Sequence, residues 1–331
     1  MIKRIKTSDL CRGMYVILPH LWLKEVFPEN HFLITTEEEL HKIHTLAAGE
    51  VSIDTIKGMD ITPVPGRGET VPAEWDSSAG ITERIRGIVA DQKLSPAKKA
   101  GAVYDESMLL MQKLFESPTA SAISESRQGV FHVVDLILSD NAVAMHMLGI
   151  LSHDYYTYTH SVNVGVLSVS LARVIYGDGD KKKLQELGAG FFFHDLGKVM
   201  VDNAVINKRG RLTEKEMGEM RTHPYKGYEI LEKAGFLTRE AELIVLQHHE
   251  RSDGRGYPRG LKGSEIHEYG RICSVADVFD ALTSERSYHS SRTSYEALKL
   301  MREELLGHFE RELFERFVLL FGEKAVPRQG A

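Results

Sequence analysis

The sequence predicts a mainly α-helical protein in which an all-α helical bundle with a metal centre follows a small α+β N-terminal domain. Three observations support this fold class. From about residue 119 onward, helical segments follow one another with short breaks at Gly, Asp and Asn. Residues 1–58 contain instead short runs rich in β-branched and aromatic residues. Five separated segments of the helical part supply five histidines and two aspartates as candidate ligands, which is enough to hold two metal ions.

Length and composition narrow the class of protein. The chain has 331 residues, a length that favours two domains. Its 41 Lys and Arg and 47 Asp and Glu leave a net charge of −6, which argues against binding of a nucleic-acid polymer. Cys11 and Cys273 lie far apart, so we expect no disulfide framework and a cytoplasmic location. Without a stretch of 18 apolar residues or an apolar leader, neither a membrane span nor a signal peptide is expected.

The first 58 residues predict the small α+β domain. Residues 14–18 and 31–34 are expected to form strands, and residues 51–54 alternate as a half-buried strand does. Thr35 or Thr36 is expected to cap a short helix whose first turn is acidic. Residues 59–79 are rich in Pro, Gly and Ser and predict a linker.

Residues 80–127 predict connecting helices. Apolar residues recur there at three- and four-residue steps, and Pro96 is expected to separate two helices. The polar faces of these helices are consistent with a contact in a homodimer, and equally with packing onto the following domain.

Residues 128–331 predict the helical domain that carries the site. His160, Val164, Leu167 and Leu171 fall on one face of one helix. Thr213 to Glu216 form a capping box, and Thr238 caps a helix that ends at the pair His248-His249. Each candidate ligand is therefore expected on a helix or at its end.

The residues themselves favour metal ligation. A single histidine on an apolar face, such as His160, is more often a core residue than a ligand. The pair His194-Asp195, however, follows an apolar run, and a carboxylate there is costly to bury unless it is paired or metal-bound. The same argument holds for Asp277. Neighbouring histidines of a helix point about 100° apart, so His248 and His249 can both ligate only near a helix end; otherwise one of them is an outer hydrogen-bond donor.

Imidazole and carboxylate donors without a thiolate suit Zn, Fe, Mn or Ni. Two such ions can activate water and clamp a phosphoryl displacement, so phosphoester hydrolysis is the first hypothesis.

Four segments carry a family resemblance. HDLGK, the His-Pro pair after Met-Arg, HHERSDGRGYP and VADVFDALTS resemble the HD-GYP branch of the HD phosphohydrolase family, over roughly residues 130 to 321. The N-terminal part resembles a domain of unknown function that often precedes that branch. The resemblance implies an HD-type helical bundle and hydrolysis of cyclic di-GMP to the linear dinucleotide, in some members onward to GMP.

The resemblance also implies roles for residues. Asp195 would bridge two divalent metals, Fe or Mn, with Zn or Ni as alternatives, and a hydroxide between them would attack phosphorus. The ligands of one metal would be His160, His194 and Asp277, and those of the other His223, His248 and His249. Lys198 would neutralise phosphate charge or protonate the leaving oxygen. Tyr156 stands where some members have a glutamate that helps to hold a third metal, so two metals are expected.

Substrate contacts follow from the same resemblance. The GYP loop, with Gly256 and Tyr257, is expected near the substrate and near signalling protein partners, although a rigid structural turn explains its glycines equally well. Arg286 resembles a family arginine that contacts phosphate or guanine, and His289 stands where many members have a second basic residue. Two alternatives stay open: hydrolysis of another cyclic dinucleotide or nucleotide, and a cyclic di-GMP-binding signalling module with little turnover.

Overall fold

The computed structural model describes residues 2–6, 10, 14–17, 31–34, 43, 50–54, 80–151, 157–177, 179–208, 210–284 and 292–322. The chain divides into two compact units, Met1–Pro72 and Ala73–Ala331. Some predictions concern residues outside this described part of the chain. They are the helix at Thr35, the linker at residues 59–79, and the roles of Tyr156, Arg286 and His289.

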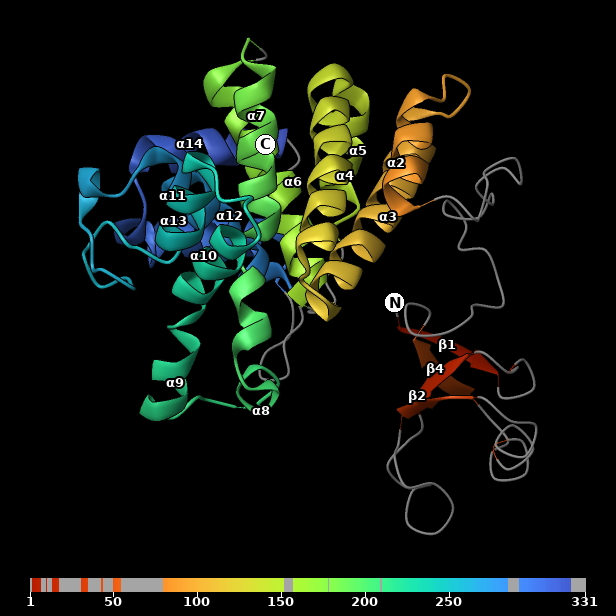
Figure 1. The fold of residues 1–331 in the computed structure, drawn as a ribbon, viewed down its shortest axis with the longest axis horizontal. Coiled ribbons are helices and arrows are strands. Elements are labelled where there is room, and N and C mark those ends of the chain that lie inside the picture. Colours follow the sequence, from red (N-terminus) through yellow and green to blue (C-terminus); the bar gives the residue numbers. More distant parts are fainter. Residues whose placement is uncertain are drawn as a thin grey trace, which may run out of the picture. The chain divides into compact units, whose positions relative to one another are not determined.

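The first unit contains an antiparallel sheet (Figure 1), with strand order β1-β4-β2-β3. Its strands are β1 (Ile2–Lys6), β2 (Tyr15–Ile17), β3 (His31–Leu33) and β4 (Glu50–Asp54). In β4, Val51 and Ile53 are buried and Ser52 between them is half-exposed, which confirms the predicted alternation. The sequence patterns predicted β2, β3 and β4. They missed β1, because Lys3 and Arg4 interrupt any alternation of apolar residues.

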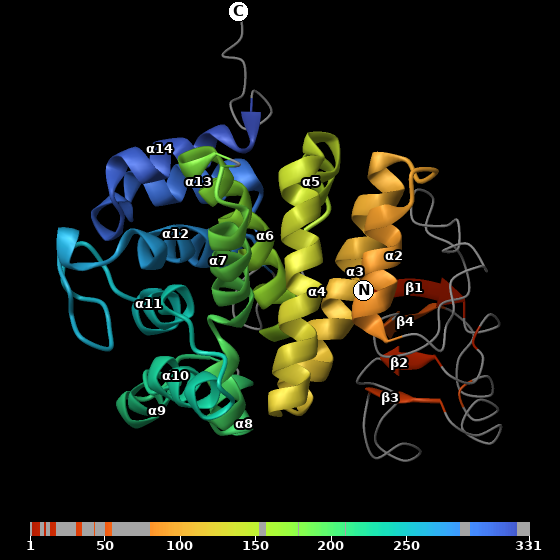
Figure 2. The same cartoon turned by 45° about the horizontal axis from the view of Figure 1, so that its top comes forward.

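The second unit is helical in the residues described, which confirms the predicted fold class (Figures 1 and 2). Its α-helices are α2 (Ile81–Ala90), α3 (Pro96–Glu116), α4 (Ala120–Ser139), α5 (Asn141–Gly149), α6 (Thr157–Tyr176), α7 (Lys181–Phe193), α8 (Asn203–Ile206), α9 (Glu214–Met220), α10 (His223–Lys233), α11 (Arg239–Gln247), α12 (Glu268–Thr283), α13 (Ser294–Glu303) and α14 (Arg311–Leu319). Short 3-10 turns are η3 (Leu196–Met200), η4 (Gly263–Glu265) and η5 (Leu306–His308).

Helix α6 forms the centre of this unit and packs against α3, α7 and α12. Every residue from Thr159 to Ala172 is buried, so the whole circumference of the helix is covered. The sequence predicted only one buried face. Gly165 permits part of this packing, because a Cβ there would lie 2.3 Å from the ring of Phe192.

Helix starts follow the predicted capping residues. Ser95 caps α3 with Pro96 at the first helical position, which confirms the predicted separation from α2. Thr213 and Glu216 form the predicted capping box of α9, and Thr238 caps α11. Thr213 and Thr238 thus set where α9 and α11 begin, whereas α10 opens with His223 and has no side-chain cap at Thr222.

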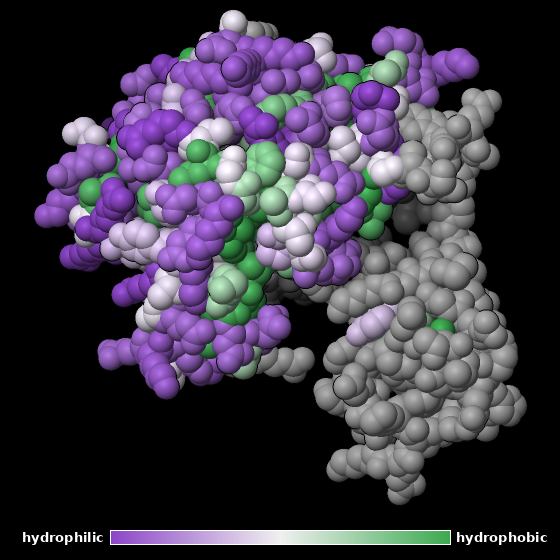
Figure 3. Space-filling view, in the orientation of Figure 1, coloured by the Kyte–Doolittle hydropathy of each residue, from purple (hydrophilic) through white to green (hydrophobic). Residues whose placement is uncertain are grey.

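The face of the helical unit seen in Figure 3 is mainly hydrophilic, and hydrophobic residues occur there in small separate patches. None of the helices among the described residues is long and apolar enough to cross a membrane.

Candidate metal centre

The structure brings the seven predicted ligand residues into one cluster from five places in the helical unit, and all of them except the partly exposed His249 are buried. His160 lies on α6 and Asp277 on α12, while His223 is the first residue of α10. His194 and Asp195 directly follow the last residue of α7, and His248 and His249 follow the last residue of α11. The two neighbouring histidines thus lie at a helix end, the arrangement in which both can face one site.

The cluster comprises two groups of residues. Within each group, the atoms that could bind a metal lie within 4.8 Å of one another. One group consists of Asp195, His223, His248 and His249, and the other of His160, His194 and Asp277.

The carboxylate of Asp195 lies between the two groups. Its Oδ1 is 3.2 Å from Nε2 of His223 and 3.7 Å from Nε2 of His248. Its Oδ2 is 3.4 Å from Nε2 of His160 and 3.5 Å from Nε2 of His194. The two oxygens therefore face different pairs of imidazoles, which is the geometry that a bridging carboxylate requires.

Hydrogen bonds on the far side of three rings fix which nitrogen faces the centre. Nδ1 of His194 bonds the carbonyl oxygen of Phe191 at 2.8 Å, and Nδ1 of His223 bonds that of Met220 at 2.8 Å. Nδ1 of His248 bonds the carbonyl oxygen of Val245 at 2.9 Å. Because a carbonyl oxygen only accepts, each Nδ1 carries the proton and each Nε2 of a neutral ring keeps its lone pair.

This leaves lone pairs directed at one another. Nε2 of His223 lies 3.2 Å from Nε2 of His248, and neither carries a proton in the neutral rings. Nε2 of His194 and Oδ1 of Asp195 are buried without a hydrogen bond. Buried polar atoms are nearly always satisfied, so a group of facing acceptors fits a cation between them. The donors present therefore fit divalent metal ions.

Burial and charge perturb the titration of these groups. Burial lowers the pKa of His223 to about 4, although the negative charge of the nearby Asp195 acts in the opposite direction. Burial likewise lowers the pKa of His194 and of His249. Burial alone would raise the pKa of Asp195, but the charge of Lys198 and the neighbouring imidazoles hold it well below its usual range. Neutral imidazoles and an ionised carboxylate are the forms that bind metal.

His160 differs from the three histidines whose Nδ1 bonds a backbone carbonyl, His194, His223 and His248. Its Nδ1 bonds Oδ2 of Asp280 at 2.7 Å, and its Nε2 lies 3.1 Å from Oδ1 of Asp277. Burial lowers its pKa, but the hydrogen bonds and charges of the two aspartates outweigh burial and raise the pKa to about 10. Sequence reasoning missed Asp280. The argument applied to Asp277, a carboxylate within a buried apolar helix, applies to Asp280 one turn later and would have found it.

Lys198 faces the centre from η3. Its ammonium lies 2.5 Å from Oδ2 of Asp195, and only 8% of the residue is exposed. Lys198 is therefore not a solvated surface lysine, because its side chain is buried against the central carboxylate.

The GYP loop folds back onto the end of α11. A Cβ on Gly256 would lie 2.4 Å from the amide nitrogen of Arg251 and 2.6 Å from the carbonyl oxygen of His249. Both carboxylate oxygens of the buried Glu250 accept backbone hydrogen bonds, from Arg259 at 2.7 Å and Leu261 at 2.9 Å. The close approach at Gly256 is thus to the chain's own backbone, as the structural explanation of the loop requires.

The same loop places Tyr257 against the centre. Its ring lies 4.6 Å from that of His249 at an interplanar angle of 33°. The guanidinium carbon of Arg221 lies 5.6 Å from the centre of the tyrosine ring. Tyr257 therefore covers one candidate ligand and carries a cation beside it.

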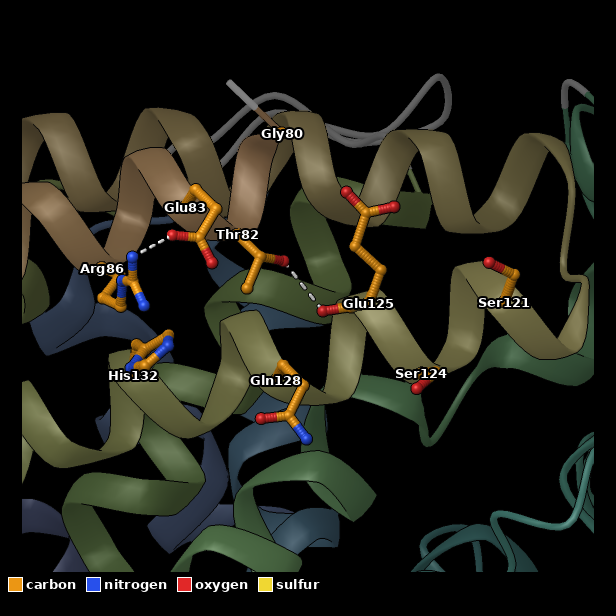
Figure 4. Close-up of a pocket in the computed structure, with 9 residues that line it drawn as sticks. All are labelled: Gly80, Thr82, Glu83, Arg86, Ser121, Ser124, Glu125, Gln128 and His132. Carbon is orange, nitrogen blue, oxygen red and sulfur yellow. Dashed lines mark hydrogen bonds and ion pairs between the residues drawn. The ribbon is translucent and has the colours of Figure 1, made fainter. Parts of the chain in front are cut away.

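A hollow of about 600 Å³ elsewhere in the unit plays no part in this centre (Figure 4). Thr82, Glu83 and Arg86 of α2 line one side and residues of α4 line the other, and Arg86 is paired with Glu83. None of the predicted site residues lines it.

Comparisons with known proteins match both units. A family model described as an HD domain matches residues 165–313, and one described as a domain of unknown function (DUF3391) matches residues 2–121. A cyclic di-GMP phosphodiesterase of Pseudomonas aeruginosa is 32% identical over 335 residues, covering 97% of this chain and 77% of the relative. A 3'3'-cGAMP-specific phosphodiesterase of Vibrio cholerae is 37% identical over 160 residues, covering 48% of this chain and 34% of the relative.

A solved structure has a similar fold. It is titled an HDG"Y"P protein from Bdellovibrio bacteriovorus and aligns with a TM-score of 0.61 and 18% identity, covering 96% of this chain and 98% of that one. Together with the 32% identity over most of both chains, these matches place the protein in a family. The chain belongs to the HD-GYP branch of the HD phosphohydrolase family, with the domain of unknown function at its N-terminal side.

Proposed function

We propose that this chain is a metal-dependent phosphodiesterase that hydrolyses cyclic di-GMP. The observation that carries the proposal is the convergence of the Nε2 atoms of His160, His194, His223 and His248 on the two oxygens of Asp195. Relatives named as cyclic di-GMP phosphodiesterases support the choice of substrate. The products are the linear dinucleotide and, if a second bond is cleaved, GMP.

The centre is proposed to hold two divalent ions. Asp195 would contact both, with His160, His194 and Asp277 at one and His223, His248 and His249 at the other. Two cations held in this way lower the pKa of water and stabilise charge on phosphate oxygens.

The donor set supports Fe or Mn, with Zn or Ni as alternatives. All seven side chains offer nitrogen or oxygen. The one thiol among the described residues, Cys273, is buried, and burial raises its pKa well above the usual value. It therefore stays protonated and does not add a thiolate to the set.

Residues beside the metal ligands would position the ligands and neutralise the charge of the phosphate. Lys198 holds the Asp195 carboxylate by a charge-assisted hydrogen bond and places positive charge at the centre, where a phosphate would enter. Tyr257 packs on His249 and limits the movement of that ring. Arg286 and His289, which lie outside the described residues, remain proposed contacts to the dinucleotide.

The test combines metal analysis of the purified protein with chromatography of the products formed from cyclic di-GMP. Bound metal together with formation of the linear dinucleotide supports the proposal. Metal-loaded protein that binds cyclic di-GMP without turnover contradicts it and favours a signalling module.

A second substrate needs a direct comparison. The chain is 37% identical over 160 residues to a 3'3'-cGAMP-specific phosphodiesterase, so the hybrid dinucleotide is the closest competitor. Rates on equal concentrations of cyclic di-GMP and 3'3'-cGAMP, measured in one set of assays, decide between them. A higher kcat/KM for 3'3'-cGAMP would overturn the choice of cyclic di-GMP.

Partner proteins are also proposed. The GYP loop presents the exposed side chains of Arg255 and Arg259 and is the proposed surface for a signalling partner. The helices α2 and α3 are the proposed contact in a homodimer. Light scattering of the purified chain tests the homodimer, and a single-chain mass would contradict it.

A further inference from the structure

A chain of hydrogen bonds continues outward from His160. The buried carboxylate of Asp280 accepts from Nδ1 of His160 at 2.7 Å through its Oδ2 and from Nδ2 of Asn163 at 2.7 Å through its Oδ1. The hydroxyl of Ser284 also donates to Oδ2 of Asp280, at 3.1 Å. Asn163 lies on α6 and Asp280 on α12, so the carboxylate links the two helices that carry His160 and Asp277.

Tyr104 on α3 is the next member of this chain. Its hydroxyl donates to Oδ1 of Asn163 at 2.6 Å, and both residues are buried, with exposures of 1% and 0%. This bond fixes the orientation of the amide: because Oδ1 accepts from Tyr104, the NH₂ group must face Asp280. Tyr104 of α3 therefore orients the amide of Asn163, and this amide in turn donates to the carboxylate of Asp280 that holds His160.

Helix α3 lies in a different family segment from six of the seven candidate ligands, and His160 falls between the two segments. Tyr104 lies within residues 2–121, which match the domain of unknown function, whereas residues 165–313 match the HD domain. Helix α3 packs directly against α6, so the side chain reaches the centre within one compact unit.

We propose that Tyr104, Asn163 and Asp280 are positioning residues that hold the ring of His160 for metal binding, and that α3 thereby completes the metal centre. The proposal rests on the metal-dependent function above. His194, His223 and His248 are each oriented by a backbone carbonyl three residues earlier in the chain. His160 is oriented instead by a side chain 120 residues away.

Burial argues for a specific role of this chain of polar groups. A carboxylate, an amide and a phenol are costly to bury, and apolar side chains of similar volume would pack α3 against α6 as well or better. Each of the three is hydrogen-bonded to its neighbour in this network. Such fully paired networks fix one arrangement of the groups they contain.

The experiment titrates Mn²⁺ into the metal-stripped full chain. We compare the native protein with Asp280→Asn, Tyr104→Phe and the control Ser107→Ala. Ser107 is buried on the next turn of α3, and among the described residues its hydroxyl bonds the carbonyl of Val103 alone, within the same helix. Asp280→Asn has a single acceptor oxygen and cannot serve both His160 and Asn163, so its dissociation constant should rise about 10- to 100-fold.

Tyr104→Phe keeps the ring and removes one hydroxyl, so it should fold and bind Mn²⁺ about fivefold more weakly. Ser107→Ala should bind as the native protein does. The rise in melting temperature on adding Mn²⁺ is the second readout, and it should be smaller in Tyr104→Phe than in Ser107→Ala.

A native dissociation constant in Tyr104→Phe together with a lower melting temperature of the metal-free protein would overturn the inference, because the tyrosine would then be a packing residue. Failure of the native protein to bind Mn²⁺, Fe²⁺ or Zn²⁺ would instead overturn the proposed function, and the inference with it.

Discussion

The carboxylate of Asp195 is buried, and burying a charge is unfavourable unless the charge is paired. One of its oxygens faces two imidazoles, and the other contacts Lys198 and two further imidazoles. The positive charge of Lys198 faces the carboxylate, and the Nε2 lone pairs of His223 and His248 are directed at one another across 3.2 Å. A metal centre resolves this arrangement, since each lone pair then has a partner.

We expect Asp195→Asn to lower both metal content and turnover to background, because an amide offers one neutral oxygen where a carboxylate offers two charged ones. Metal analysis and product chromatography measure the two effects. Asp195→Ala should in addition lose about 3–5 kcal/mol of stability, since it leaves the buried ammonium of Lys198 without its partner. Two metals per chain in Asp195→Asn would contradict the bridging role.

The presence of a tyrosine at position 156 predicts that the centre holds two metal ions. Tyr156 lies outside the described residues, and the prediction comes from its type: a phenol with a pKa near 10 is a poor ligand at neutral pH. Metal analysis of the native protein should give two ions per chain, and Tyr156→Glu should admit a third. Tyr156→Phe serves as the control and should retain two; loss of a metal in that variant would show that the phenol ligates.

At the level of single residues, the sequence predicted the seven members of the cluster but not the groups that orient them. His194 and Asp195 are adjacent in a distinctive motif, so pattern alone is informative. The bonds that join Tyr104 to Asn163 and Asn163 to Asp280 connect residues 59 and 117 positions apart. Pairs so far apart in the chain produce no periodic pattern in the sequence. Only the packing of α3, α6 and α12 brings them together.

At the scale of elements, the close packing of η3 on α10 determines the position of His223. A Cβ on Gly197 would lie 1.9 Å from the carbonyl oxygen of His223 and 2.4 Å from the amide nitrogen of Gly227. These are backbone atoms, so a side chain at Gly197 cannot be accommodated without moving α10. The glycine of HDLGK thus serves helix packing beside the centre, a role that the sequence analysis did not assign.

Gly197→Ala is therefore expected to destabilise the fold by about 1–3 kcal/mol and to weaken metal binding at the His223 side. Denaturant unfolding and metal titration measure the two effects. The matched control is Gly218→Ala in α9, where a Cβ would meet no atom within 4 Å. That variant should gain about 0.5–1 kcal/mol, as alanine does over glycine within a helix. Equal behaviour of the two variants would contradict the packing argument.

Helix α9 offers a test of pH dependence. Hydrogen bonds from Lys208 and from the backbone and hydroxyl of Thr213 lower the pKa of Glu216 to about 2 from 4.5. A depressed pKa stabilises the folded state above the unfolded value and loses that effect as pH falls from about 4.5 towards 2. The native protein should therefore be more stable than Glu216→Gln at pH 6, and this difference should shrink at pH 3.

The control for this helix is Glu214→Gln, because the side chain of Glu214 makes no hydrogen bond to the described residues. This variant removes a carboxylate from the same first turn and leaves the capping box intact, so it measures the effect of charge alone. Denaturant unfolding in the presence of a chelator keeps the metal centre out of the comparison. A difference for Glu216→Gln that is equal at pH 6 and pH 3 would contradict the role of the capping box.

Capping residues determine where a helix begins, whereas the periodicity of apolar residues determines only part of which helix surface is buried. Thr213 and Thr238 each act within a single turn, so the sequence predicted their positions in the structure. The pattern around His160 indicated one apolar face, whereas α6 is buried on all sides. Ser161, Ser168 and Ser170 are small and polar, and only their tertiary neighbours determine that they too are covered.

At the scale of the whole molecule, the centre connects α6, α7, α10, α11 and α12 through one group of ligands. Metal bound there stabilises the folded helical unit and has no counterpart in the unfolded chain, so removing it should lower stability. At a free metal concentration of about 100 times the dissociation constant, the gain is about 2.7 kcal/mol. For a unit of this size, that gain corresponds to roughly 5–10 °C in melting temperature.

We therefore expect a chelator to lower the calorimetric transition of the helical unit by roughly 5–10 °C relative to protein saturated with Mn²⁺. The transition of the α+β unit should not move, because the seven candidate ligands all lie in the helical unit. Asp195→Asn provides the control: its helical unit should melt at the same temperature with chelator and with Mn²⁺. An equal response to Mn²⁺ in the native protein and in this variant would mean that the ions bind elsewhere, since the variant lacks the carboxylate that faces both groups of histidines.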